Sequence, residues 1–307
     1  MIRSPFFFLG LATIGLSFFS LKSAYLRASF YSKYKNSVIV ITGGSSGVGA
    51  ALTRLLAKDL PDCHLVVLAR SADLLIALKE EIERECRPGR CDVFAVDCSD
   101  GEALKAVARK VGRAGIVVAN AGAGTFRAIW EREATPEETN KCLLAPLSAA
   151  LHTAHAFLPA MVDAGEGIFL AVQSPASRIP WPGATAYTAA RFGLRGVIAA
   201  LSQDLFGRGV KACEVIIAEV TDSAYFLNNP GSKQRVPAIS PWFGEVTSAE
   251  AALGIRDALI SGAPLSFSPF RYRLAFASMA FPGIETVVLM LLRLTGWRGN
   301  PEVYLYE

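Results

Sequence analysis

The sequence predicts an α/β protein in which a single domain is built on a doubly wound parallel sheet. Short runs rich in β-branched residues alternate with segments of helical character from Ser37 to Ser261. Strand–helix–strand units are right-handed, and a series of them forms a parallel sheet with helices on both faces. This region contains no internal repeat and no linker that would divide it into two domains.

The expected elements follow one another along the region. Helices are expected at Ala50–Lys58 and Ala72–Glu85, and Asp100 can cap the helix after the third strand. Thr135 can cap a later helix, with Pro136 at its first position and Glu138 closing a capping box. The expected strands are Val38–Thr42, His64–Ala69, Val93–Val96, Ile116–Ala119, Ile168–Val172 and Cys213–Ile217.

The composition argues against two classes of site. The formal charge is +4, and the Lys and Arg residues are dispersed, without the basic stripe of a nucleic-acid binder. The six cysteines show no Cys-x-x-Cys spacing, and the three histidines have no metal-ligand spacing with them. We therefore expect no nucleic-acid partner, no metal, and reduced thiols in a domain that faces the cytosol.

The N-terminus has the character of a membrane anchor helix. The seventeen residues of Pro5–Leu21 carry no charge, which is at the short limit for a bilayer span of roughly 20 residues. A cleaved signal peptide is the alternative, but no Ala-x-Ala-like site follows. The positive-inside rule places the folded domain in the cytosol, because the cations gather after the apolar stretch at Lys22, Arg27, Lys33 and Lys35.

A glycine-rich turn follows the first expected strand and leads directly into a helix. It reads Thr42-Gly43-Gly44-Ser45-Ser46-Gly47-Val48-Gly49. Glycines let the backbone turn sharply and approach a pyrophosphate, whose charge the N-terminus of the next helix stabilises. The strand before the turn and the helix after it make this a specific signal for a dinucleotide.

The pattern Thr-Gly-x-x-x-Gly-x-Gly resembles the cofactor fingerprint of short-chain dehydrogenases/reductases, which have a Rossmann fold. Later segments agree in order: Asp97-Cys98 after the third strand, Asn120-Ala121-Gly122 after the fourth, and then Ser174 and Tyr187, which are 13 residues apart. The resemblance implies NADP(H) as cofactor. The residues that it implies for cofactor binding are Gly43, Ser45, Ser46, Gly47, Val48, Gly49, Arg70, Asp97, Cys98, Asn120, Ala121, Gly122, Tyr187, Arg191 and Ser223.

The second strand ends in Ala69-Arg70, and this pair favours NADPH over NADH. In the family that this chain resembles, members that select NAD have an acidic residue at this position, and it binds the ribose 2′-hydroxyl. The chain has Ala69 there, and the guanidinium of Arg70 suits a 2′-phosphate that a carboxylate would repel.

The resemblance implies hydride transfer between a nicotinamide and a carbonyl or alcohol. Tyr187 would be the general acid or base, and Ser174 would hydrogen-bond the substrate oxygen. A free phenol has a pKa near 10, which a neighbouring cation lowers. The family has lysine four residues after the tyrosine, and Arg191 stands there in this chain. Arginine keeps the charge but holds its proton too firmly for a relay.

Three further places in the chain depart from the family pattern. An ungapped comparison places Pro146 where the family has an asparagine that holds a water. The Pro-Gly pair after the sixth strand is replaced by Ala218-Glu219, so that the Glu219 carboxylate either lies near the nicotinamide or faces solvent. Ser223 stands where the family has a threonine that contacts the carboxamide.

An apolar segment, Leu274–Leu294, ends the chain and is interrupted by Pro282, Gly283 and Glu285. A carboxylate near its middle argues against a second membrane span. An amphipathic element lying on the membrane, a flap over the substrate pocket and a buried helix remain open. The predicted division is an anchor with its basic flank at 1–35, the Rossmann domain at 36–262, and this C-terminal segment at 263–307.

Two hypotheses for function follow. The first is an NADPH-dependent oxidoreductase at a membrane that interconverts a ketone and an alcohol on an apolar substrate (lipid, sphingoid, steroid or retinoid). In its apolar ends and its Thr-Gly-Gly-Ser-Ser-Gly turn the chain is similar to 3-ketodihydrosphingosine reductases, which implies the endoplasmic reticulum. The alternative is a catalytically impaired NADP(H)-binding scaffold or sensor. The family resemblance also implies a homodimer.

Overall fold

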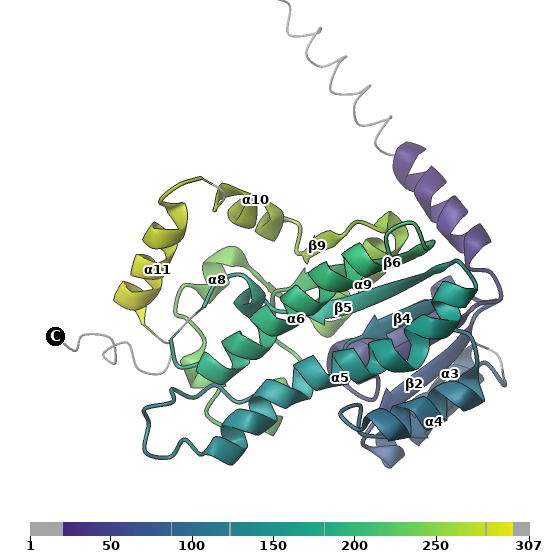
Figure 1. Cartoon of the computed structure of the whole chain (residues 1–307), viewed down its shortest axis with the longest axis horizontal. Coiled ribbons are helices and arrows are strands. Elements are labelled where there is room, and N and C mark those ends of the chain that lie inside the picture. Colours follow the sequence, from purple (N-terminus) through teal and green to yellow (C-terminus); the bar gives the residue numbers. More distant parts are fainter. Residues whose placement is uncertain (1–20, 87, 123, 181, 280, 297–307) are drawn as a thin grey trace, which may run out of the picture.

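A parallel sheet of seven strands lies at the centre of the residues that the structure describes (Figure 1). The computed structural model describes residues 21–86, 88–122, 124–180, 182–279 and 281–296. The strand order is β3-β2-β1-β4-β5-β6-β9, and every neighbouring pair is parallel. The strands are β1 (Val38–Thr42), β2 (His64–Ala69), β3 (Cys91–Ala95), β4 (Ile116–Ala119), β5 (Gly167–Gln173), β6 (Val210–Ile217) and β9 (Leu265–Ser268).

Helices cover both faces of the sheet, as a doubly wound fold requires. One face carries α2 (Gly47–Asp59), α3 (Ala72–Glu85) and α9 (Ser248–Ser261). The other carries α4 (Gly101–Val111), α5 (Pro136–Asp163) and α6 (Thr185–Asp204). Successive residues of one strand point to opposite faces. Thus Ile39 and Ile41 join the first apolar core and Val40 joins the second.

The remaining elements follow β6 and β9. A two-stranded parallel sheet pairs β7 (Glu219–Val220) with β8 (Glu245–Val246), and the short helices between them are α7 (Tyr225–Asn228) and α8 (Ser240–Phe243). One-turn 3-10 helices lie at Pro175–Ser177 and Lys233–Arg235. After β9 come α10 (Arg271–Ser278) and α11 (Ile284–Thr295).

Most expected elements are confirmed, and two differences have a clear origin. The third strand begins at Cys91, earlier than the expected Val93, because Cys91 pairs in register with Leu65 of β2. β9 was not expected and lies beyond the expected domain end at residue 262. Its sequence Leu-Ser-Phe-Ser is short and half polar, yet it pairs with β6.

The helix caps follow the sequence in part. Asp100 caps α4 through hydrogen bonds from the amides of Glu102 and Ala103, both at 3.0 Å. The Thr135 hydroxyl accepts a hydrogen bond from the amide of Glu138 at 3.1 Å. The Glu138 carboxylate, however, binds the Arg127 guanidinium at 2.9 Å instead of closing the expected capping box. A charged donor is a stronger partner for a carboxylate than a backbone amide.

The two ends of the chain differ in what the structure describes. The expected anchor at Pro5–Leu21 falls, except for Leu21, outside the described residues and remains a prediction. Residues 21–33 are helical and extend away from the sheet, and Phe30 packs into the core (Figure 1). Among the described residues, α5 alone has the length and apolar character of a membrane span, but 44% of its apolar window is buried.

Candidate active site

A cavity of about 1190 Å³ opens where the strands of the main sheet end. In parallel α/β sheets ligands bind beyond the carboxyl ends of the strands, at the point where the strand order reverses. That point here lies between β1 and β4. All the expected catalytic and cofactor-binding residues, from Gly43 to Ser223, line this one cavity. Their individual roles stay predictions.

The glycine-rich turn has the backbone geometry that its sequence predicts. Gly43 and Gly47 have φ values of +65° and +49°, which side chains rarely adopt. A Cβ on Gly43 would lie 2.8 Å from the Cα of Ala121, and one on Gly49 would lie 2.2 Å from the Gly43 carbonyl oxygen. The turn therefore needs glycine at these positions, and it directs the N-terminus of α2 toward the cavity.

Asn120 supports this turn with its side chain. Its Nδ2 donates to the carbonyl oxygens of Thr42 at 3.1 Å and Gly43 at 3.2 Å. The amides of Asn120 and Ala121 both donate to the Thr42 hydroxyl at 3.0 Å. The end of β4 thus holds the turn in place.

One end of the cavity has the features of a nucleoside site. Arg70 is exposed at its edge, and Ala69 beside it is buried. Hydrogen bonds from the Ser99 hydroxyl at 2.7 Å and amide at 2.9 Å lower the pKa of Asp97, and Arg70 lowers it further. Burial raises the pKa of the Cys98 thiol to about 12, so this thiol stays protonated at neutral pH.

The three expected catalytic residues all line the cavity, and two of them are in contact. Ser174 follows β5, and its hydroxyl oxygen accepts a hydrogen bond from the Ala176 amide at 3.3 Å, which leaves its proton available for a substrate. Tyr187 lies in the first turn of α6 and is 5% exposed. Arg191 follows one turn later, with its Cζ 5.0 Å from the centroid of the Tyr187 ring. This is a cation–π distance.

Arg191 is fixed from several sides. It is 8% exposed, and its Nη1 donates to the Val172 carbonyl oxygen at 3.1 Å. Its own carbonyl oxygen accepts a hydrogen bond from Gln173 Nε2 at 3.3 Å. Both partners belong to β5, so the sheet itself holds the cation beside Tyr187. The expected pairing of these two residues is present, and a guanidinium in a protein does not release its proton.

Of the other departures from the family pattern, Glu219 lines the cavity and Pro146 packs behind Gly122, which lines it. Pro146 is buried in α5 against Gly122, where a Cβ would lie 3.1 Å from the proline Cβ. Proline removes the backbone bond to residue 142. Glu219 lines the cavity, and its carboxylate accepts a hydrogen bond from the Ser240 hydroxyl at 3.4 Å. The Glu219 side chain thus extends toward α8.

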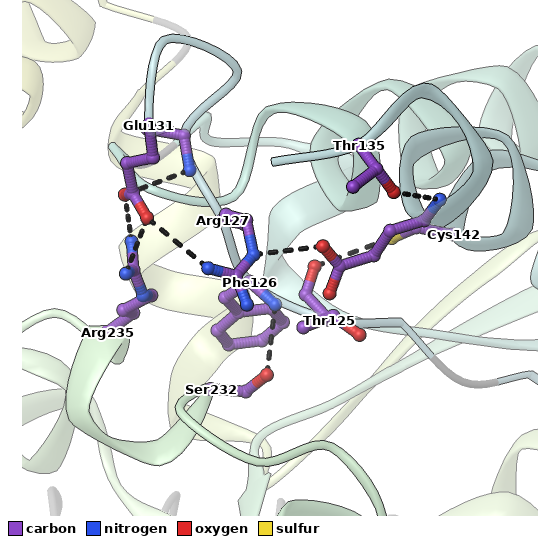
Figure 2. Close-up of polar contacts among 10 residues, drawn as sticks. Thr125, Phe126, Arg127, Glu131, Thr135, Cys142, Ser232 and Arg235 are labelled. Atoms are coloured by element: carbon purple, nitrogen blue, oxygen red, sulfur yellow. Dashed lines mark hydrogen bonds and ion pairs between the residues drawn. The ribbon is translucent and has the colours of Figure 1, made fainter. Parts of the chain in front are cut away.

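A wall of polar and aromatic contacts surrounds Phe126, which lines the cavity, and sequence reasoning did not find it (Figure 2). The Phe126 ring lies 4.8 Å from the Tyr187 ring, centroid to centroid, and its amide donates to the buried Ser232 hydroxyl at 2.9 Å. Glu131 binds the guanidinium of Arg235 through both carboxylate oxygens. Residues more than 100 positions apart meet here, and no local pattern indicates such a contact.

Comparisons with known proteins agree with this geometry. A glycine betaine reductase of Emericella nidulans is 31% identical over 187 residues, which are 58% of this chain but 14% of that much longer protein. An uncharacterized oxidoreductase of Mycobacterium tuberculosis is 29% identical, over 71% of this chain and 83% of its own. A 3-dehydrosphinganine reductase of Arabidopsis thaliana is 27% identical, over 78% and 74%.

Solved structures show the same fold. An alcohol dehydrogenase of Thermococcus sibiricus, complexed with 5-hydroxy-NADP, has a TM-score of 0.63 at 26% identity and covers 75% of this chain and 94% of its own. An NADPH-bound short chain oxidoreductase of Pseudomonas aeruginosa, described as containing an atypical catalytic center, has a TM-score of 0.62 at 25% identity, over 73% and 89%.

The family match confirms what the motifs indicated. The short chain dehydrogenase family matches residues 37–226, which is more than half of the 307 residues. The expected Rossmann fold is confirmed by the sheet order and by the solved structures. This chain belongs to the short-chain dehydrogenase family of oxidoreductases.

Proposed function

We propose that the protein interconverts a ketone and an alcohol on an apolar substrate, with NADP(H) as cofactor. The observation that carries this proposal is the meeting of Ser174, Tyr187 and Arg191 in the cavity that also holds the glycine-rich turn. A binding module would need the turn but not a buried phenol with a cation beside it.

The residues present fit NADPH. The turn at Gly43–Gly49 would hold the pyrophosphate at the N-terminus of α2, and Arg70 would bind the 2′-phosphate. Asp97 and Cys98 would flank the adenine, and Ser223 would contact the carboxamide. When bound, the nicotinamide supplies the hydride. Solved relatives at 25 and 26% identity contain NADPH or an NADP derivative, which supports the same choice here.

Side chains of the protein would then carry out the proton transfer. Ser174 would donate a hydrogen bond to the carbonyl oxygen and hold it beside Tyr187. Tyr187 would give its phenolic proton to that oxygen, and the guanidinium of Arg191 would stabilise the phenolate that remains. Because arginine keeps its own proton, Arg191 contributes charge and not a relay.

The substrate side of the cavity is apolar. Beyond the catalytic residues its walls come from α8, α10 and α11, with the side chains of Phe243, Phe276, Met279, Val288 and Leu292. Such walls favour an extended hydrocarbon next to the ketone. The likeness to a 3-dehydrosphinganine reductase supports a lipid substrate of this kind.

The decisive experiment measures NADPH oxidation by the purified, detergent-solubilised chain with long-chain ketones. We expect turnover that Tyr187→Phe abolishes while NADPH binding persists. If the folded protein binds NADPH but reduces no ketone and oxidises no alcohol, the second candidate stands. That candidate is a cofactor-binding scaffold or sensor, and it is favoured by the three departures at Pro146, Arg191 and Glu219.

We also propose that the domain works at the cytosolic face of the endoplasmic reticulum membrane, held by the predicted N-terminal anchor. Exposed apolar side chains gather on α10 and α11 and near them, including Phe270, Leu274, Phe281, Met290 and Leu294. These helices also line the cavity, so a lipid could pass from the bilayer to the catalytic residues. By family likeness we propose a homodimer, which light scattering in detergent would detect.

A further inference from the structure

Tyr187 has a second phenol beside it, at Tyr225. Tyr225 begins α7, in the segment that follows β7, and lines the same cavity. Its hydroxyl donates to the carbonyl oxygen of Gly124 at 2.8 Å. Gly124 in turn lies against Tyr187, because a Cβ built there would be 2.6 Å from Cδ2 of that ring.

The Phe126 ring lies close to the rings of both Tyr187 and Tyr225. Its ring centroid is 4.8 Å from that of Tyr187 and 6.5 Å from that of Tyr225. The Phe126 amide is held by Ser232, so the arrangement is set by the wall described above. The side chains of Tyr225 and Tyr187 also interact, and this interaction raises the pKa of Tyr225.

The groups that face the Tyr225 hydroxyl leave it protonated. Burial raises its pKa well above the usual value, and the neighbouring Tyr187 raises it further. Arg191 lowers it, and Cys142 raises it. Burial also raises the pKa of the Cys142 thiol to about 11, so this thiol stays neutral. At neutral pH the Tyr225 hydroxyl is therefore a hydrogen-bond donor, and Arg191 is the charged group beside it.

We propose that Tyr225 is a positioning residue for proton transfer, and that its hydroxyl hydrogen-bonds the phenolate that Tyr187 becomes when it protonates the substrate. This rests on the proposed function. The hydroxyl takes up part of the stabilisation for which the family uses lysine and an ordered water, at a site where this chain has Arg191 and Pro146.

The protons balance with solvent water as the source of the one proton that each reduction consumes. Before reaction the single Tyr225 proton points to the Gly124 carbonyl oxygen. When Tyr187 transfers its proton to the ketone oxygen, the Tyr225 hydroxyl turns that proton toward the new phenolate. Tyr187 is protonated again from water after the alcohol leaves, and the Tyr225 hydroxyl returns to Gly124. Tyr225 never loses its proton.

The test compares Tyr225→Phe with the unaltered full-length chain in detergent. This change removes one oxygen atom and keeps the ring that packs on Phe126. A hydrogen bond to a charged group contributes about 1.5–3 kcal/mol, which corresponds to about tenfold or more in rate. We expect kcat for ketone reduction to fall by that factor. The high-pH limit of the rate should also move upward by about one pH unit or more, with NADPH affinity unchanged. Tyr34→Phe, a buried tyrosine away from the cavity, is the matched control.

A second measurement does not need turnover. NMR of tyrosines labelled at the carbon that bears the hydroxyl follows ionisation of residue 187, assigned with Tyr187→Phe, in the NADPH-bound protein. Tyr225→Phe should move this ionisation to higher pH, and Tyr34→Phe should not. An unmoved ionisation overturns the role of Tyr225, whether or not any ketone is reduced. Absence of turnover in the unaltered chain would contradict only the proposed function.

Discussion

At the residue scale, the proposed proton transfer depends on the guanidinium of Arg191, which lies beside the Tyr187 ring. We expect Arg191→Met to lower kcat for ketone reduction by about a hundredfold or more, because the phenolate of Tyr187 loses its neighbouring cation. Arg191→Lys should keep activity within about tenfold, since a cation remains. Arg195→Met, on the exposed side of the same helix one turn later, is the control. Equal turnover in Arg191→Met and Arg195→Met would refute the role.

We expect the choice between NADPH and NADH to depend on Ala69 and Arg70, which line the cavity. A carboxylate at the end of β2 repels a 2′-phosphate and binds a 2′-hydroxyl. Ala69→Asp should therefore weaken NADPH and strengthen NADH, with a change of about tenfold to a hundredfold in the ratio of the two Kd values. Titration of cofactor fluorescence measures both. Arg84→Ala, which is exposed on α3 and outside the cavity, should leave the ratio unchanged.

The sequence could predict where the candidate catalytic residues lie because their spacing is local and regular. Ser174 ends a strand, and Tyr187 and Arg191 are one helical turn apart, so both could be placed before any contact was known. Phe126 and Tyr225 could not be placed this way. They reach Tyr187 only after loops far apart in sequence fold onto one another, and an aromatic residue in a loop carries no periodic signal.

At the scale of elements, the ion pair of Glu131 and Arg235 joins the loop before α5 to the segment after α7. Both side chains are mostly buried, with exposures of 11% and 21%. Removal of one partner leaves the other charge buried, at a cost of about 1–3 kcal/mol. Arg235→Gln should therefore lower the free energy of unfolding by that amount and reduce activity, because Phe126 and Tyr225 lose their support. Lys105→Gln, whose pair with Glu102 is exposed, should change stability by less than about 1 kcal/mol.

The ion pair of Glu131 and Arg235 also predicts that the free energy of unfolding depends on pH. Burial raises the pKa of Glu131, but the hydrogen bond and charge of Arg235, the hydrogen bond from the Ala128 amide and the charge of Arg127 together lower it more, so the net pKa is below the usual range. A carboxyl whose pKa is lower in the folded state stabilises the protein above its unfolded pKa of about 4.3. This stabilisation is lost as the pH falls through the folded pKa. Chemical denaturation from pH 6 down to about pH 3 should show a smaller acid-induced loss in Glu131→Gln than in the unaltered chain.

Elements with a clear period could be predicted, and those set by pairing could not. β1, β2, α3 and β4 match their expected bounds because their apolar residues are continuous or regularly spaced. β9 contains two serines and exists because β6 offers it a free edge. The Glu138 carboxylate had a local partner in the expected capping box, but the distant Arg127 binds it instead.

At the scale of the whole molecule, the fold follows from the alternation of strands and helices along the sequence. Right-handed crossovers between parallel strands admit few arrangements, so an ordered series of strand and helix signals with one glycine-rich turn indicates the sheet order and the place of the cavity. The C-terminal segment has no such rule. Three alternatives were open for it, and the structure places α10 and α11 over the cavity, with Leu292 the buried member of α11. The third alternative, an ordinary buried helix, does not fit α11, whose residues other than Leu292 are exposed or half-buried.

The helices α10 and α11 cover the cavity and carry exposed apolar side chains, which bears on how the substrate reaches the catalytic residues. If α10 and α11 rest on the bilayer, a ketone dissolved in the membrane reaches the catalytic residues without crossing water. The variant Leu274→Glu/Phe281→Glu/Leu294→Glu places three charges on side chains that are 64–69% exposed. With a long-chain ketone in vesicles, its KM should rise about tenfold or more, since charges are costly at the depth where such helices lie.

Two controls distinguish a loss of membrane contact by α10 and α11 from damage to the cavity. A short, water-soluble ketone should be reduced with unchanged kcat and KM by the triple variant, because the cavity walls are intact. Phe206→Glu introduces a charge at an 88% exposed phenylalanine outside the cavity and away from α10 and α11, and it should leave both substrates unaffected. An unchanged KM for the vesicle substrate in the triple variant would show that the N-terminal segment alone brings the enzyme to lipid. Equal losses with both ketones would show that the cover shapes the cavity and does not contact the membrane.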